Sequence, residues 1–349
     1  MKTKGVIYLL LIYLAFVLII PQTVSAQESK IVTETFQVSS LKDNLFDDSP
    51  NQTIVVWLPP SYESEPEKHY PVVYLLHGWV ANSRGLKENC FIANGILKEM
   101  DSWLIEGRVE EMILVLPNSF NKLGGSWYTN SIATGNWADY IAKDLVEYVD
   151  KKYRTIPNRE SRAVLGHSMG GYGALKLGVL YSDVFSCIGI LSGKIDFGES
   201  AIQKNALFYT RMSKLKTWDD FNNLDWGLQL YLAQCAAFVP NTKKPPFYCD
   251  FPFGEGQVKN KRVHKKFLKH DGFYLLEENV DSIRKMNAIY IDCGTNDPFF
   301  EHAKKLDAKL QDLQIEHVYK EFRGTHFSGI LGGTGNALEL FSTALMYEQ

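Results

Sequence analysis

Short apolar runs recur along most of the chain, and their pattern changes after about residue 60. Residues 31–38 and 53–58 alternate between apolar and polar positions, which is typical of antiparallel strands at the edge of a sheet. Later apolar runs are continuous, over 72–76, 112–116, 163–165, 187–191 and 288–291. Continuous runs of this length indicate strands that are buried on both faces of a parallel sheet.

Helical patterns separate these runs. Residues 137–153 place apolar side chains at spacings of three and four, with charged side chains between them. This segment is therefore expected to form an amphipathic helix with one face on a sheet. Residues 299–313 and 335–347 also have helical patterns. Strands that alternate with helices predict crossover connections, and hence a doubly wound α/β fold whose sheet is mostly parallel.

The segment from 196 to 284 interrupts this alternation. It contains many aromatic residues, among them Trp218 and Trp226, but no clean strand–helix unit. Long insertions in compact domains are usually functional lids or binding loops. We expect a cap-like insertion over the sheet edge where ligands of α/β proteins bind. The alternative is a subdomain on the flank of the sheet, whose aromatic residues form only its own core.

The first 26 residues have the three parts of a secretory signal peptide. Lys2 and Lys4 precede an apolar stretch over 6–20, and small residues follow at 24–26. The apolar stretch is shorter than the roughly 20 residues of a membrane span, although an uncleaved anchor is the alternative. We expect residues 27–349 to form a single domain, exported to the periplasm or beyond and without a stable membrane span after cleavage.

The composition mainly argues against certain classes of binding partner and cofactor. The 349 residues include 37 Lys and Arg against 40 Asp and Glu, and this near-neutral balance argues against binding to nucleic acid. The five cysteines are scattered, and only Cys235 and Cys249 share a segment in which a disulfide could form. Motifs such as Cys-x-x-Cys and His-Glu-x-x-His are absent from the sequence, so we expect neither a metal nor an organic cofactor.

A candidate nucleophile lies at Ser168. Residues 166–170 read Gly-His-Ser-Met-Gly, between an apolar strand-like run and a segment with helical composition. A nucleophilic serine on a tight strand-to-helix turn needs glycine two positions before and after it, because side chains there would clash. The free N–H groups at the start of the helix would point toward the serine. A purely structural glycine-rich turn is the alternative, and the strand and helix on either side favour the nucleophile.

Serine needs a base, usually histidine, oriented by a carboxylate. His326 follows a strand-like run and precedes the last helical segment, which is where the base of such an enzyme belongs. Among the other histidines after Ser168, His302 and His317 are expected at the surface. His264 and His270 are expected to be solvated, because they lie in a Lys-rich part of the insertion.

The preferred acid is Asp297, on the loop beyond the strand at 288–291. Asp292 is the other candidate, but it lies within the strand, where an ionised carboxylate would be buried. Asp297 could instead only cap a helix that begins at Pro298. The oxyanion formed during attack on an ester needs backbone donors. Met169, directly after the nucleophile, and Trp79, after the strand at 72–76, are the candidate N–H donors. His77 is expected to be structural.

Motifs at 71–78, 125–128, 166–175, 293–297 and 324–326 together resemble the esterase D / putative esterase family of α/β-hydrolases. The resemblance covers about residues 30–195 and 285–348. It implies an α/β-hydrolase fold, with Ser168, Asp297 and His326 as catalytic residues and the N–H groups of Met169 and Trp79 as oxyanion donors. The chain departs from the family pattern at Gly-Thr-His-Phe, where Gly-Gly-His and then Trp are usual, and in the unmatched insertion.

The resemblance implies a secreted serine carboxylic-ester hydrolase that forms an acyl-enzyme, with feruloyl or acetyl groups on polysaccharide as expected substrates. Transfer of the acyl group to a sugar or lipid alcohol is one alternative, and a non-catalytic binding protein with this fold is another. Candidate substrate contacts are Trp127 and Tyr128 in a shared motif, and Trp218 and Trp226 in the insertion.

Overall fold

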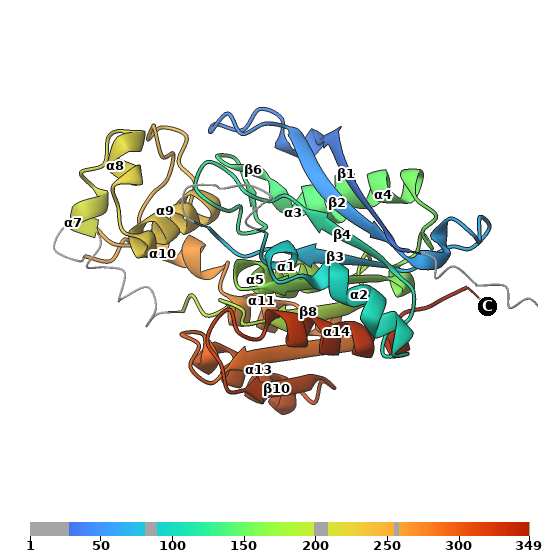
Figure 1. Cartoon of the computed structure of the whole chain (residues 1–349). Helices are drawn as coiled ribbons and strands as arrows, with labels where there is room; N and C mark the ends of the chain where they lie inside the picture. The colour runs from blue at the N-terminus through green and yellow to red at the C-terminus, as the bar shows by residue number, and fades with distance from the viewer. Residues whose placement is uncertain (1–27, 81–88, 199–208, 255–257, 349) are drawn as a thin grey trace, which may run out of the picture.

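The computed structural model describes residues 28–80, 89–198, 209–254 and 258–348. Its centre is an eight-stranded sheet in the order β1-β2-β4-β3-β7-β8-β9-β10 (Figure 1). The strands are β1 (Lys30–Gln37), β2 (Asn51–Leu58), β3 (Val72–Leu76), β4 (Ile113–Pro117), β7 (Arg162–His167), β8 (Cys187–Leu191), β9 (Ala288–Gly294) and β10 (Val318–Phe322). A separate hairpin lies outside this sheet and consists of two strands of two residues each, β5 (Asn130–Ser131) and β6 (Gly135–Asn136).

The strand directions confirm the predicted sheet. β1 pairs with β2 and β2 with β4 in antiparallel register, and the remaining neighbours are parallel. Every residue of β3, β4, β8 and β9 is buried, whereas β1 alternates between exposed and partly buried positions. This contrast follows from position, because central strands are covered on both faces and an edge strand on one.

Helices cover both faces of the sheet. One buried cluster joins alternate residues of β3 and β4 to α2 (Ile96–Ile105) and α14 (Ile330–Ala344). A second cluster joins the opposite faces of these strands to α4 (Val146–Lys152), α5 (Met169–Leu180) and α13 (Phe300–Asp312). The sheet and these helices are called the α/β core below. Short helices complete it: α1 (Cys90–Ala93), η1 (Ser39–Leu41), η2 (Pro60–Tyr62) and η5 (Arg159–Ser161).

The predicted helices are present, with changed limits. The segment expected at 137–153 forms α3 (Trp137–Asp139), a π-helical stretch over Tyr140–Leu145, and α4, which ends at Lys152. The helix expected at 299–313 is α13. The last helix, α14, begins at Ile330 and ends at Ala344, so it starts five residues before the predicted 335–347 segment.

The insertion divides into two parts. Residues 209–270, called the lobe below, form α7 (Tyr209–Met212), α8 (Trp218–Asn222), α9 (Trp226–Phe238) and α10 (Lys261–Leu268), which gather at the left of the sheet in Figure 1. In contrast, α11 (Gly272–Glu278) and α12 (Val280–Ile283) pack against α5 of the α/β core. The Gly272 N–H donates to the Ile195 carbonyl at 2.8 Å, so the chain that enters the lobe meets the chain that leaves it.

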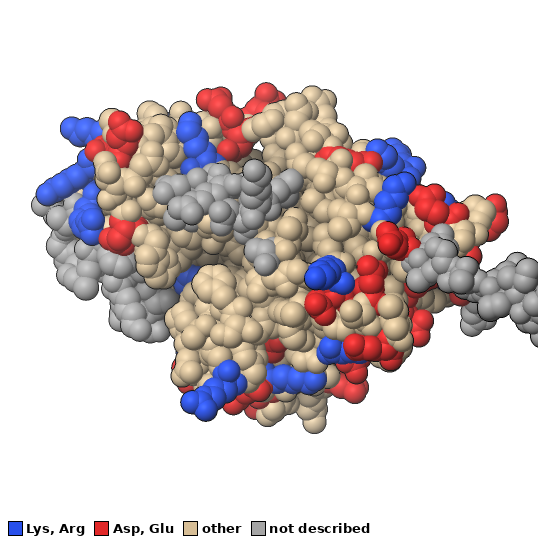
Figure 2. Space-filling view, in the orientation of Figure 1, with Lys and Arg blue, Asp and Glu red and all other residues tan. Residues whose placement is uncertain are grey.

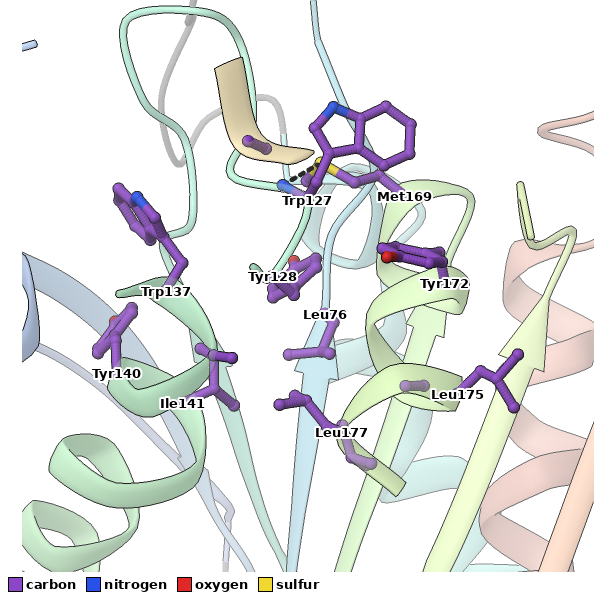
Figure 3. Close-up of a cluster of buried hydrophobic side chains, with 14 of the residues drawn as sticks. Leu76, Trp127, Tyr128, Trp137, Tyr140, Ile141, Met169, Tyr172, Leu175 and Leu177 are labelled. Atoms are coloured by element: carbon purple, nitrogen blue, oxygen red, sulfur yellow. Dashed lines mark hydrogen bonds between the residues drawn. The ribbon is translucent and has the colours of Figure 1, made fainter. Parts of the chain in front are cut away.

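Aromatic side chains hold the lobe together and join it to the α/β core. Trp218 packs edge-on against Phe221 and Phe247 within the lobe. Phe238 of α9 lies 6.0 Å from Trp127 and 5.9 Å from Tyr172, measured between ring centroids. Figure 3 shows the rings of Trp127 and Tyr172 above the sheet, at the start of α5. The buried core therefore continues from α5 into α9.

The signal peptide expected at residues 1–26 lies outside the described residues. In the ranges that the structure does describe, no helix combines the length and apolarity needed to cross a membrane. All five cysteines fall within these ranges and none is in a disulfide. Cys235 and Cys249, the pair considered for a bridge, are both buried free thiols in the lobe.

Candidate active site

Ser168 occupies the strained turn between β7 and α5. Its φ of 61° and ψ of −113° lie outside the regions that ordinary residues adopt. A Cβ atom added to Gly166 would lie 2.1 Å from the Gly170 carbonyl oxygen, and one added to Gly170 would lie 1.8 Å from that of Leu76. Only glycine fits these two positions, and the turn therefore raises Ser168 at the carboxyl edge of the sheet.

The two candidate oxyanion donors flank this turn. Met169 is the first residue of α5, so its N–H group has no acceptor within the helix. Its sulfur accepts a hydrogen bond from the Trp127 N–H at 3.4 Å, drawn as the dashed line in Figure 3. On the other side, a Cβ atom on Gly78 would lie 3.3 Å from the Ser168 Cβ, which brings the end of β3 against the serine. Trp79 follows, anchored by a 2.8 Å hydrogen bond from its indole N–H to the Leu123 carbonyl.

His326 and Asp297 form a direct pair. Asp297 Oδ2 lies 2.8 Å from His326 Nδ1, which donates to the carboxylate and so leaves Nε2 free to accept a proton. The Phe299 N–H donates to Asp297 Oδ1 at 2.7 Å. Burial acts to raise the pKa of Asp297, but the hydrogen bond and charge of His326 together with the Phe299 N–H hold that pKa below its usual value. Asp297 is therefore an ionised, fixed acceptor for the histidine.

Asp292 has a different environment. It is buried within β9, accepts a 3.2 Å hydrogen bond from the Tyr290 hydroxyl, and burial raises its pKa to about 7. Of the two candidate acids, the structure places Asp297 and not Asp292 against His326.

Two further histidines support the loops around the site. His167, directly before Ser168, donates from Nε2 to the His326 carbonyl at 2.7 Å, and its ring lies 4.6 Å from that of His326. Burial and the neighbouring His326 lower the pKa of His167 to about 3, so it is neutral. Sequence reasoning missed this contact, because 159 residues separate the two histidines. His77 accepts from the Ser119 N–H at 2.8 Å and is buried, which fits its expected structural role.

The other histidines differ from expectation. His264 and His270 are not solvated: His264 is buried against Phe253, and His270 stacks on Phe238. The Lys-rich helix α10 is amphipathic, so its lysines face solvent while His264 lies on its buried side. His302 and His317 are partly buried and hydrogen-bonded to Asp196 and Asp307 respectively, rather than simply exposed.

Ser168 and His326 line one cavity of about 570 Å³. The wall of this cavity is mainly apolar and comes from the α/β core and from α9 of the lobe. Besides Ser168 and His326, the lining residues are Gly78, Trp79, Val80, Cys90, Asn94, Trp127, His167, Lys194, Trp226, Leu230, Pro298, Phe299 and Phe327. Trp226 and Phe327 are 66% and 65% exposed, although both are large aromatic residues. They give the cavity an open, aromatic margin.

The four candidate substrate contacts separate into two pairs. Trp127 and Trp226 belong to the cavity wall. Tyr128 is buried elsewhere and its hydroxyl donates to the His77 carbonyl at 2.9 Å. Trp218 packs against Phe46 and lies outside the cavity wall. Lys194, a wall residue that sequence reasoning missed, lies just beyond β8, and its position after a central parallel strand is the signal that could have identified it.

A candidate nucleophile, a histidine oriented by a carboxylate and two candidate backbone donors lie beside a largely apolar cavity, which is the arrangement that acyl-transfer chemistry requires. Within the described ranges, no group of three or more His, Cys, Asp or Glu side chains could hold a metal ion.

Comparison with known proteins places the chain in a family. The profile of the family described as "Putative esterase" matches residues 50–329. The chain belongs to this esterase family. An esterase of Mycobacterium tuberculosis is 31% identical over 156 residues, which are 42% of this chain and 31% of that protein. An endo-1,4-beta-xylanase/feruloyl esterase of Xylanibacter ruminicola is 27% identical over 165 residues, 45% of this chain and 22% of that protein.

The chain thus spans about a third or less of the length of these curated relatives. The fold of this chain is also similar to that of a solved ferulic acid esterase, with a TM-score of 0.62 and 21% sequence identity. The match covers 91% of this chain and 99% of the solved chain. At this level of identity the likeness concerns the fold, and it confirms the α/β-hydrolase architecture.

Proposed function

We propose that the protein is a serine carboxylic-ester hydrolase that acts through an acyl-enzyme. The observation that carries the proposal is the 2.8 Å hydrogen bond between Asp297 and His326, at a cavity that Ser168 also lines. Ser168 is the nucleophile, His326 the base, and Asp297 the carboxylate that orients the base. The strained turn at Ser168 and the family membership support the same roles.

In the proposed reaction, Ser168 Oγ attacks the ester carbonyl while His326 Nε2 takes the serine proton. The oxygen of the tetrahedral intermediate becomes negative and accepts hydrogen bonds from the N–H groups of Met169 and Trp79. Collapse of the intermediate releases the alcohol, which receives the proton from His326. Water, activated by the same histidine, then attacks the acyl-enzyme and regenerates Ser168.

The substrates we propose are feruloyl or acetyl esters of polysaccharide. A cavity of about 570 Å³ with aromatic walls is large enough for an aromatic acyl group. The exposed Trp226 and Phe327 suit contact with a sugar ring or an acyl group at the cavity margin. Relatives named for feruloyl esterase activity support this substrate class, and the signal-like segment at residues 1–26 supports export to where polysaccharide is found.

The proposal is tested with the purified chain without residues 1–26, a panel of nitrophenyl acetate, nitrophenyl butyrate and methyl ferulate, and a fluorophosphonate that labels activated serines. We expect hydrolysis of at least one ester, and covalent labelling at Ser168 that disappears in Ser168→Ala. A folded protein that hydrolyses none of the esters and takes up no label would refute the proposal. Labelling at another serine would refute the assignment of the nucleophile.

A further inference from the structure

A lysine lies in the wall of the proposed active-site cavity. The backbone N–H of Lys194 donates to the Ser168 carbonyl at 3.2 Å, so Lys194 is tied to the turn that carries the nucleophile. Its ammonium lies 5.0 Å from the centre of the Phe197 ring and 5.3 Å from that of Phe299. Phe299 also belongs to the cavity wall. The positive charge therefore stands over aromatic rings beside the reacting groups.

Among the described residues of the cavity wall, this charge has no acidic partner. The described residues of the wall include no Asp or Glu, and no ion pair or side-chain hydrogen bond of Lys194 is found among them. The nearby Asp196 carboxylate is already paired with Lys305 at 2.8 Å and also accepts from the Gly198 N–H. His302, the other titratable neighbour, is kept neutral by burial and by Lys194, which lower its pKa to about 4.

The same observations argue against a purely structural lysine. Burial lowers the pKa of Lys194 to about 8, which means that its surroundings disfavour the charge even though Asp196 raises the pKa in part. Lys194 is half-buried, and an ammonium partly removed from water is normally matched by a carboxylate of the protein, because an unmatched charge is costly. An anionic group on a bound substrate would supply the missing partner, and the cavity is where that group would enter.

The lobe beside the cavity adds an independent electrostatic observation. Residues 209–270 contain eleven Lys and Arg against five Asp and Glu, although the whole chain has a net charge of −3. Figure 2 shows Lys and Arg side chains over the lobe at the left of the molecule. On α10 the exposed side carries Lys261, Arg262, Lys265 and Lys266. A long anionic substrate would be attracted to this part of the surface.

We propose that Lys194 is a specificity-determining residue that binds a carboxylate on the ester substrate. The inference rests on the proposed ester hydrolysis and adds a charge requirement to it. The carboxylate can belong to the acyl group, as in a half-ester of a dicarboxylic acid, or to the alcohol, as in an acylated uronic acid. The basic lobe favours the second source, because only the larger alcohol part of the substrate could extend to α10.

The test uses two matched pairs of esters at pH 7. Nitrophenyl butyrate and the nitrophenyl half-ester of succinic acid differ only by a methyl or a carboxylate at the end of the acyl chain. Acetylated methyl glucoside and acetylated methyl glucuronoside differ by a carboxylate on the alcohol. For each pair, the ratio of kcat/KM for the anionic ester to that for the neutral ester is measured in the wild type, in Lys194→Met and in Lys194→Arg.

The matched control is Lys304→Met. It removes the same charge from the nearby helix α13, where Lys304 is half-exposed and pairs with Glu301 at 3.4 Å. We expect the wild type to prefer the anionic ester in at least one pair, and Lys194→Met to lower that ratio about tenfold, since it removes the charge partner. Lys194→Arg should keep most of the preference, and Lys304→Met should leave the ratio within about twofold, since it affects only long-range charge.

Each outcome decides the matter. A ratio that Lys194→Met does not change in either pair, while neutral esters are hydrolysed, would overturn the role of Lys194 and leave the proposed function intact. If Lys304→Met changes the ratio as much as Lys194→Met does, the preference depends only on net charge, and the role of Lys194 is overturned as well. Hydrolysis of none of the four esters by the wild type would remove the proposed function and this inference together. If Lys194→Met does not fold, Lys194→Gln takes its place.

Discussion

The α/β core and the lobe contribute to the same cavity but are built by different kinds of contact. In the α/β core, backbone geometry fixes the proposed reacting groups: the strained turn holds Ser168, the Phe299 N–H holds Asp297, and the His326 carbonyl accepts from His167. In the lobe, aromatic side chains pack on one another, as Trp218 does on Phe247. Backbone contacts tolerate little change, whereas side-chain packing can be altered piece by piece. We therefore expect the α/β core to fix the proposed chemistry and the lobe to be the part that can adapt to the substrate.

The sharpest test of this division removes a reacting group from the α/β core. Ser168→Ala and His326→Ala are each expected to lower kcat for a nitrophenyl ester by about 10⁴-fold or more, because nucleophile and base act as one unit. The melting temperature should change little, since neither side chain fills a core position. Activity is followed by nitrophenol release and folding by circular dichroism. Residual activity above one per cent of wild type (~10² loss) in either folded variant would contradict the assignment.

The next effect separates the two candidate acids of the α/β core. Asp297→Asn should lower kcat by about 10²- to 10⁴-fold. The Phe299 N–H holds the amide oxygen, so the amide NH₂ faces His326 Nδ1 and favours the tautomer with the proton on Nε2, which cannot act as the base. Asp292→Asn leaves the histidine pair in place and should retain most of the activity, with its cost appearing as lower stability. The two variants are matched in chemistry and lie on the same stretch of chain. The reverse result, with activity lost only in Asp292→Asn, would assign the acid to Asp292.

A third test addresses the boundary between the two regions. Lys176 of α5 is buried, donates to Thr129 Oγ1 at 2.6 Å and lies 3.3 Å from Nδ1 of His270, at the end of the lobe. Burial lowers the pKa of Lys176 from 10.5 to about 7. Between these two values the unfolded chain binds more protons than the folded chain, so this lysine makes stability rise with pH from about 7 toward 10.

Lys176→Met removes that dependence. The variant should therefore be more stable than the wild type at pH 7, by a free energy of unfolding on the order of 2 kcal/mol, with a smaller difference at pH 9. Urea unfolding at the two pH values measures the difference in free energy of unfolding between variant and wild type. Lys304→Met, at an exposed position, is the control. A difference that is the same at both pH values would show that Lys176 is not the titrating group.

The smallest expected effect concerns substrate choice by the lobe. Trp226→Ala should change the ratio of kcat/KM for methyl ferulate to that for nitrophenyl acetate by about three- to tenfold, because Trp226 is an exposed part of the cavity wall. Trp218→Ala and Phe253→Ala are the matched controls, because both rings belong to aromatic packing of the lobe and lie outside the cavity wall. They should lower stability and leave the ratio unchanged. If the ratio in Trp226→Ala equals that in the two control variants, the lobe does not contribute to substrate selection.

The sequence predicts the α/β core well because its signals are local. Continuous apolar runs identify β3, β4, β8 and β9, and alternation identifies β1, because the residue pattern reflects burial on one or two faces. The expectation for 53–58 as an alternating edge strand is wrong: β2 lies between β1 and β4 and is buried from Ile54 to Leu58. The turn at Ser168 is equally local, because its two glycines and its serine lie within five residues. The end of the strand at 288–291 is also a local signal, and it favours Asp297, on the loop beyond the strand, over Asp292. The structure places Asp297 against His326.

The remaining features depend on contacts between distant parts of the chain. Lysines surround His264 and His270 in the sequence, which predicts solvated side chains. In the structure, the amphipathic α10 buries His264, and His270 is partly covered by stacking on Phe238. The contact of His167 with the His326 loop and the position of Lys194 in the cavity wall depend on how neighbouring strands align. The assignment of Tyr128 to substrate binding rests on a shared motif, and that of Trp218 on aromatic character within the insertion. Neither signal distinguishes a core residue from a cavity residue.

The hydrogen bond between Gly272 and Ile195 has a consequence for how such a protein can diversify. It closes the chain at the base of the lobe, so the polypeptide departs from the α/β core and returns to it at nearly one point. A loop of different length or sequence can begin and end at such a point without displacing β8, β9 or the strained turn. The lobe is thus an exchangeable cassette: transplanted between relatives at these two residues, it should carry substrate preference with it and leave the catalytic machinery of the recipient in place.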